Sequence, residues 1–110
     1  MRWITASSGT LGTTAQQIST LYGNLRVRQV LIRSRPQNAG YVWFGQVTTG
    51  TGNPPTSTLT STNGWTLERG QESPSLDYGT GATHFYEFYA LSATAGTDRV
   101  DFLILVDDNA

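Results

Sequence analysis

The strongest constraint on the fold comes from residues 26–47, RVRQVLIRSRPQNAGYVWFGQV. Two runs rich in β-branched and aromatic residues flank a segment that contains Pro36, Asn38 and Gly40, which are residues typical of turns. Apolar residues that alternate with polar ones, or follow one another, predict a β-strand on each side of this turn. We therefore expect two strands that pair with each other and an all-β domain around them.

The two runs differ in how they distribute their apolar residues. In residues 26–33 neither alternate set is cleanly apolar, which favours a β-bulge near Arg28 that turns Val27, Val30 and Ile32 to the same side. In the second run both alternate sets are apolar. Such a strand is either central in a sandwich or covered on its outer side by another chain.

Residues 84–92 and 99–106 show a similar excess of apolar residues. One acidic residue in each segment, Glu87 or Asp101, marks the face that we expect to point outward. Apolar side chains share that face, and a monomer would expose them to water. These side chains are Phe85, Tyr89, Leu91, Leu103 and Leu105.

The whole pattern predicts an all-β fold: a single antiparallel β-sandwich or jelly-roll-like domain of about seven or eight short strands. Residues 1–12 are expected to form an N-terminal arm or an edge strand, and residues 13–110 the sandwich. Residues 13–22 fit a short helix or a strand, and we favour the strand because the surroundings are β. The polar segment 48–63 is either an arm that contacts a partner or a solvated loop.

The composition narrows the classes of function. The 110 residues correspond to one domain, and a net charge of −1 argues against an electrostatic nucleic-acid binder. No Cys is present, so neither disulfides nor thiolate metal sites can form. No apolar run approaches the roughly 20 residues of a membrane helix, and we expect a soluble chain without an export signal.

Few residues suggest catalysis. The only histidine, His84, is expected to be packed or half-exposed, because a catalytic base needs an orienting partner beside it. Glu68 and Glu72 flank a Gly turn and suit a solvated turn better than a carboxylate pair. Nothing resembles a calcium-binding loop. We therefore expect a protein that is not an enzyme and has no metal or cofactor.

Two groups of side chains suit contacts with a partner. Arg26, Arg28, Arg33 and Arg35 lie within ten residues and either bind carboxylates on a partner or protect a sheet edge from pairing. The aromatic residues Tyr41, Trp43 and Trp65 either pack in the core or stack on a sugar or a base.

Several segments together resemble small structural proteins of tailed bacteriophages, most of all capsid decoration (cement) proteins. The resemblance spans about residues 26–106 and excludes the loop at 48–63. The segments are RQVLIRS (28–34), YVWFG (41–45), LERGQES (67–73), YALSATAGT (89–97) and VDFLIL (100–105).

The resemblance implies a virion protein, made in the host cytoplasm, that binds the major capsid protein on the outside of the shell and stabilises it. It also implies a homo-oligomer, with a trimer favoured. The alternative is a binding module of a tail fibre or baseplate that recognises a host-surface glycan without catalysis. The residues that we predict to bind partners are Trp3, Ile4, Arg26, Arg28, Tyr41, Trp43, Pro54, Pro55, Leu59, Phe85, Tyr89, Leu103 and Leu105.

Overall fold

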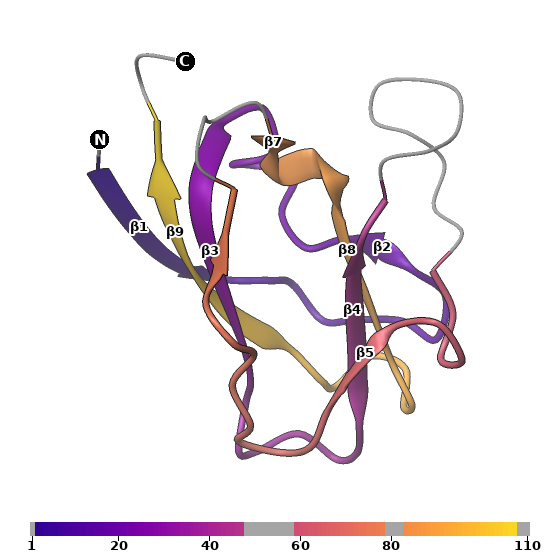
Figure 1. The fold of residues 1–110 in the computed structure, drawn as a ribbon. Coiled ribbons are helices and arrows are strands. Elements are labelled where there is room, and N and C mark those ends of the chain that lie inside the picture. The colour runs from indigo at the N-terminus through magenta and orange to yellow at the C-terminus, as the bar shows by residue number, and fades with distance from the viewer. Residues whose placement is uncertain (1, 48–58, 79–82, 108–110) are drawn as a thin grey trace.

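The computed structural model describes residues 2–47, 59–78 and 83–107, which form two antiparallel sheets packed against each other (Figure 1). The elements are β1 (Arg2–Ser7), β2 (Gln16–Gln17), β3 (Arg26–Ser34), β4 (Val42–Gln46), β5 (Trp65–Leu67), β6 (Leu76–Asp77), β7 (Thr83–His84), the 3₁₀ turn η1 (Phe85–Glu87), β8 (Phe88–Ser92) and β9 (Val100–Val106). Sheet A has the order β1-β9-β3-β6, and β7 also pairs with β3. Sheet B has the order β2-β8-β4-β5.

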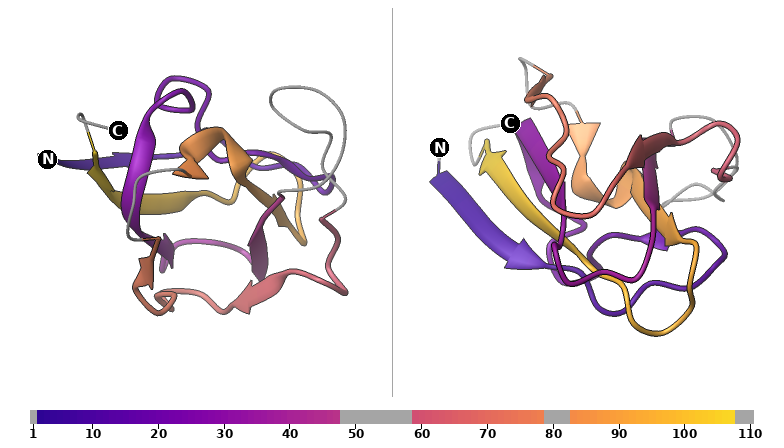
Figure 2. Two further views of the ribbon diagram at one scale, coloured as in Figure 1. Left: turned by 45° about the horizontal axis from the view of Figure 1, so that its top comes forward. Right: turned by 90° about the horizontal axis from the view of Figure 1, so that it is seen from below.

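The order of pairing is that of a jelly roll. β1 pairs with β9, β2 with β8, β3 with β6, and β4 with β5. The chain thus behaves as one long hairpin that is rolled up so that its successive pairs alternate between the two sheets (Figure 2). The predicted all-β antiparallel sandwich is confirmed.

The predicted pairing within residues 26–47 is wrong. β3 lies inside sheet A between β9 and β6, whereas β4 lies inside sheet B between β8 and β5. The segment between them therefore crosses from one sheet to the other instead of closing a hairpin. The sequence pattern identified both strands but not their partners, because local alternation carries no information about which strand lies alongside.

Buried polar side chains hold this crossing segment in place. The Asn38 side chain donates to the Arg99 carbonyl oxygen at 2.8 Å and accepts from the Arg99 N–H at 3.0 Å. The Asp98 carboxylate accepts the N–H groups of Ala39 at 2.8 Å and Gly40 at 3.2 Å. These contacts join positions about 60 residues apart in the sequence, so they direct the chain across the sandwich.

The β-bulge in β3 has the predicted position. The register against β9 shifts between Val27 and Gln29, which leaves Arg28 as the extra residue. Val27, Val30 and Ile32 are consequently all buried on the inner side of sheet A. The core that they join also includes Leu11, Ile18, Val42, Phe44, Leu67, Phe85, Phe88, Ala90, Val100, Phe102, Ile104 and Val106.

The prediction that Phe85 points outward is wrong. Residues 85–87 form a 3₁₀ turn, not a strand, and the turn shifts the alternation so that Phe85 and Phe88 both enter the core. The Phe85 ring lies 4.8 Å from that of Phe102, between centroids. The Glu87 carboxylate accepts the backbone N–H of His84 at 3.0 Å and so holds the turn.

Tyr89 and Leu91 do lie on the outer side of sheet B, but the chain itself covers them. Their exposed fractions are only 7% and 5%. Leu59 lies over this side, and a Cβ atom at Gly45 would come within 2.9 Å of its side chain. Glycine at this position therefore permits the close approach of residue 59, and no second chain is needed to bury Tyr89 or Leu91.

The segment 13–22 is mostly irregular. Only Gln16 and Gln17 form a strand, which pairs with Tyr89 and Ala90 of β8. Ile18 is buried in the core just beyond this short strand. The prediction of a strand over the whole segment is therefore wrong in extent. Pairing of two residues and burial of Ile18 are enough to hold this part of the chain against the sheets.

Candidate functional site

The described residues hold no group of three or more acidic, histidine or cysteine side chains that could bind a metal ion. His84 stacks on Tyr86, with ring centroids 4.7 Å apart and planes 9° from parallel. Glu87, the acidic residue nearest in sequence, binds the His84 backbone N–H and the Gln46 side chain. This arrangement favours a structural role for His84.

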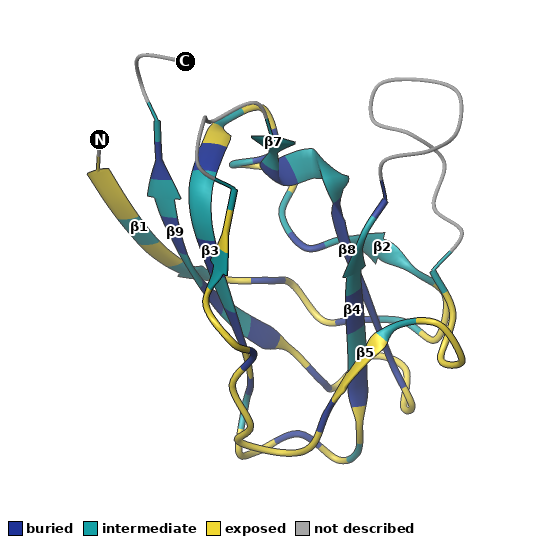
Figure 3. Cartoon of the chain, in the orientation of Figure 1, coloured by how far each residue is buried: buried dark blue, intermediate teal, exposed yellow. Residues whose placement is uncertain are grey.

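The outer side of sheet A carries an apolar strip that remains open to solvent. Cross-strand register places Trp3 of β1 beside Leu105 of β9, and Leu103 of β9 beside Leu31 of β3. Trp3 is 53% exposed, and the three leucines are partly exposed. Figure 3 shows the contrast in burial between β1, which is largely exposed, and the central strands of the sheet, which are not. We call these four residues the outer strip.

A charged network borders the outer strip. The Asp101 carboxylate accepts from Arg33 Nη2 at 2.7 Å, from Arg35 Nε at 2.9 Å and from the Ser7 hydroxyl at 2.6 Å. Arg35 Nη2 also donates to the Ser7 hydroxyl, at 2.6 Å. The network links β1, β9 and β3 and fixes two guanidinium groups beside the apolar side chains.

The network also determines the charge of Asp101. Partial burial would by itself raise the pKa of this carboxyl, but the hydrogen bonds from Arg33, Ser7 and Arg35 and the charge of Arg35 outweigh it and lower the pKa from 3.8 to about 2. Asp101 is therefore ionised at neutral pH. A second carboxylate, that of Glu72, lies beside Arg33 on the paired backbone, so this border of the strip presents charges of both signs.

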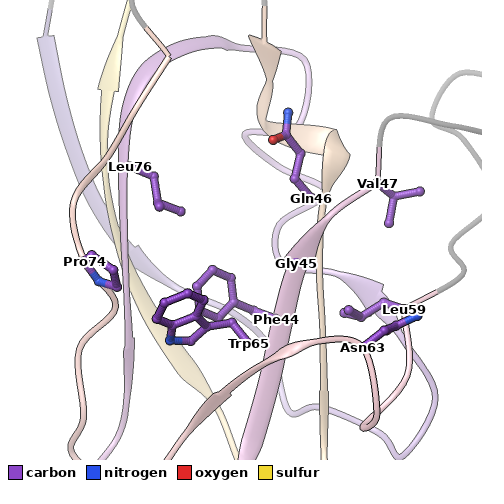
Figure 4. A pocket seen from close by; sticks show the side chains of 9 residues that line it. All are labelled: Phe44, Gly45, Gln46, Val47, Leu59, Asn63, Trp65, Pro74 and Leu76. Atoms are coloured by element: carbon purple, nitrogen blue, oxygen red, sulfur yellow. The ribbon is translucent and has the colours of Figure 1, made fainter.

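A second surface is a cleft of about 410 Å³ where sheet B meets the segment that leads into β6 (Figure 4). Trp65 is 54% exposed and lies in front of the buried Phe44. Pro74 and Leu76 form the opposite wall, and Gln46 stands above them. Among the described residues that line it none is charged, so this part of the cleft suits an uncharged ligand with both apolar and polar groups.

The structure brings only some of the predicted partner residues together. Trp3, Leu103 and Leu105 share the outer strip. Ile4 lies in the same strand but packs partly against the core. Arg26 is exposed at the start of β3, and Arg28 occupies the bulge.

The other predicted partner residues lie elsewhere. Tyr41 and Trp43 form a pair with ring centroids 6.2 Å apart at the other sheet, where Leu59 also lies. Phe85 and Tyr89 are buried within the protomer. Pro54 and Pro55, with most of the loop at 48–63, fall outside the described residues.

Sequence reasoning missed three components of this surface: Leu31, the placement of Arg33 beside it, and the partners of Asp101. The alternation in β3 contained a usable signal, because Leu31 and Arg33 have the same parity and must share a face beyond the bulge. The pairing of β3 with β9 was not deducible from that pattern.

Comparisons of the chain with protein-family models, curated proteins and solved structures found no match. No helix in the described part of the chain is long and apolar enough to cross a membrane. Function is therefore inferred from the fold and its surfaces.

Proposed function

We propose that this protein is a virion structural protein that binds the outside of a capsid shell, by contact with the major capsid protein, and stabilises the shell. The observation that supports this proposal best is the outer strip. An apolar surface on three adjacent strands, bordered by charged groups, is typical of a protein-binding site. The jelly roll is also a fold that viral capsid proteins use, although the fold alone does not establish a role.

The outer strip suits a large, regular partner surface. Its residues project from paired strands, so binding orders few additional backbone atoms. Arg33 and Arg35 are already held by Asp101, and their remaining donors can reach carboxylates of the shell. Each contact is modest, but one shell offers many equivalent sites, and an oligomer would bind several of them at once.

Replacing both Leu103 and Leu105 with serine is expected to weaken binding to undecorated capsids by about 10- to 100-fold, because two buried apolar contacts are lost. Cosedimentation of the variant with purified capsids measures this change. The matched control is Leu21→Ser, since Leu21 is 79% exposed and lies outside sheet A. Equal retention of the double variant and the wild type would contradict the proposal, as would an equal loss in the control.

A second candidate function, a glycan-binding module of a tail fibre or baseplate, is favoured by the cleft at Trp65. An exposed indole can stack on the apolar face of a sugar ring, and the Gln46 amide can bind hydroxyl groups at its edge. Gln46 Nε2 donates to Glu87 Oε1 at 3.0 Å, which orients the amide at the top of the cleft.

Trp65→Ala is expected to reduce retention of the protein on host cells about tenfold if the cleft binds glycan, because the stacking surface is lost. Binding of labelled protein to cells measures the effect, and Trp3→Ala is the control because Trp3 is similarly exposed on the other sheet. Competition by capsids, or equal loss in both variants, would argue against a glycan site.

A further inference from the structure

The outermost strand of sheet A differs from the other sheet edges. β1 has six residues, whereas the edge strands β2, β5 and β6 have two, three and two. Short edge strands are one way in which proteins prevent pairing between sheets, and Lys or Pro residues are another. β1 contains neither Lys nor Pro, and Arg2 is its only charged residue. The strand is therefore a long edge without the usual protection.

The hydrogen bonds to β9 show which backbone groups of this edge are free. The Ser8 N–H donates to the Val100 carbonyl oxygen at 2.8 Å, directly after the last paired residues of β1 and β9. In an antiparallel strand, alternate residues bond to the same neighbour. Counting back from Ser8, every second residue therefore directs its backbone N–H and C=O groups toward β9. The backbone groups of the intervening residues point away from β9. The residues that face away are Trp3, Thr5 and Ser7.

No strand of the described residues pairs with this outer edge. We propose that a second copy of the chain pairs with it, β1 antiparallel to β1, about a two-fold axis at Thr5. A row of free N–H and C=O groups is complementary to another extended backbone. Centring the axis on Thr5 sets Trp3 of each copy opposite Ser7 of the other, so that the free groups of both strands meet. Arg2 then lies opposite Ser8, and no like charges face each other.

This pairing would make one continuous sheet from the two copies of sheet A. It would also place the two outer strips on the same side of that sheet, because the two-fold axis that relates antiparallel edge strands runs perpendicular to the sheet. The inference goes beyond the proposed function, since the pairing requires no shell. A contact of this kind is isologous and closes at two copies, unlike the trimer that the resemblance implies.

Light scattering on protein separated by size is the test. The wild type is expected to change from the 12.0 kDa of one chain to twice that mass as its concentration rises. Thr5→Asp and Thr5→Lys should each keep the mass of one chain, because the axis sets two like charges opposite each other. An equal mixture of the two variants should restore the doubled mass. Thr66→Asp, on the exposed edge of sheet B, is the matched control and should behave as the wild type.

A wild type that keeps the mass of one chain at its highest soluble concentration, or that forms a trimer, would overturn the inference. Failure of the mixed variants to pair would overturn the axis at Thr5. If a charged variant does not fold, Thr5→Pro replaces it, because it removes an N–H that β9 does not use. Cosedimentation of Thr5→Pro with capsids separates the two proposals, because proline blocks the pairing without placing a charge beside Leu103 of the outer strip, and retention of that monomer would support shell binding independently of pairing.

Discussion

Replacing Phe85 with alanine is expected to lower the free energy of unfolding by about 3–5 kcal/mol, because the substitution leaves a cavity in a fully buried aromatic cluster. Phe85 contacts the rings of Phe88 and Phe102, with centroids 5.7 and 4.8 Å away. Neither sheet can close over the lost ring without moving the other. Urea unfolding followed by circular dichroism measures the loss.

Tyr86→Ala is the control for this cavity. Tyr86 is the next residue in the same turn, but it is only partly buried and stacks on His84 at the surface. Its loss should cost about 1 kcal/mol or less. If Phe85→Ala instead unfolded at the wild-type urea concentration while self-association was lost, Phe85 would belong to an interface and not to the core.

Replacing Asp98 with alanine is expected to lower the free energy of unfolding by about 2–4 kcal/mol. The carboxylate is fully buried and accepts the N–H groups of Ala39 and Gly40, so its removal leaves two backbone donors without acceptors. The loss should appear as a lower urea midpoint with an unchanged slope, since the size of the folded core does not change.

Thr97→Val removes a different donor to the same carboxylate, the hydroxyl of the exposed neighbour Thr97. The Thr97 hydroxyl donates to Asp98 at 3.1 Å, but it is not one of the two backbone donors of the crossing segment. We expect a loss of about 1 kcal/mol or less from this variant. Equal effects of Thr97→Val and Asp98→Ala would show that the backbone contacts do not hold the segment between the sheets.

The all-β fold was predictable because its signals are local. β-Branched and aromatic residues predicted where the strands lie. In β3 neither alternate set of residues is cleanly apolar, and this pattern indicated the bulge that places Val27, Val30 and Ile32 in the core. The positions of β3, β4 and β9 thus followed from their own residues. The choice of partner did not, because Asn38 and Asp98 direct the chain through contacts with residues about 60 positions away.

The candidate site was only partly predictable, and a single turn explains much of the error. Alternation through residues 84–92 assumes an unbroken strand, but the 3₁₀ turn reverses the parity at Phe85. Apolar side chains do lie on the outer faces of both sheets, but they are covered on one sheet and open on the other. On sheet B, Leu59 and neighbouring segments cover it. On sheet A the outer strip stays open, and Leu103 and Leu105 remain candidates for partner contact.

The winding of the jelly roll also affects the order in which the protein can fold. β1 precedes the other strands of the sandwich in the chain and its pairing partner β9 follows them, so β1 leaves the ribosome well before β9. Folds dominated by such distant pairings form slowly, typically in milliseconds to seconds, because a long loop must close before the contact stabilises it. Throughout synthesis β1 therefore has two free edges instead of one. Sheet A can be completed only when β9 enters between β1 and β3.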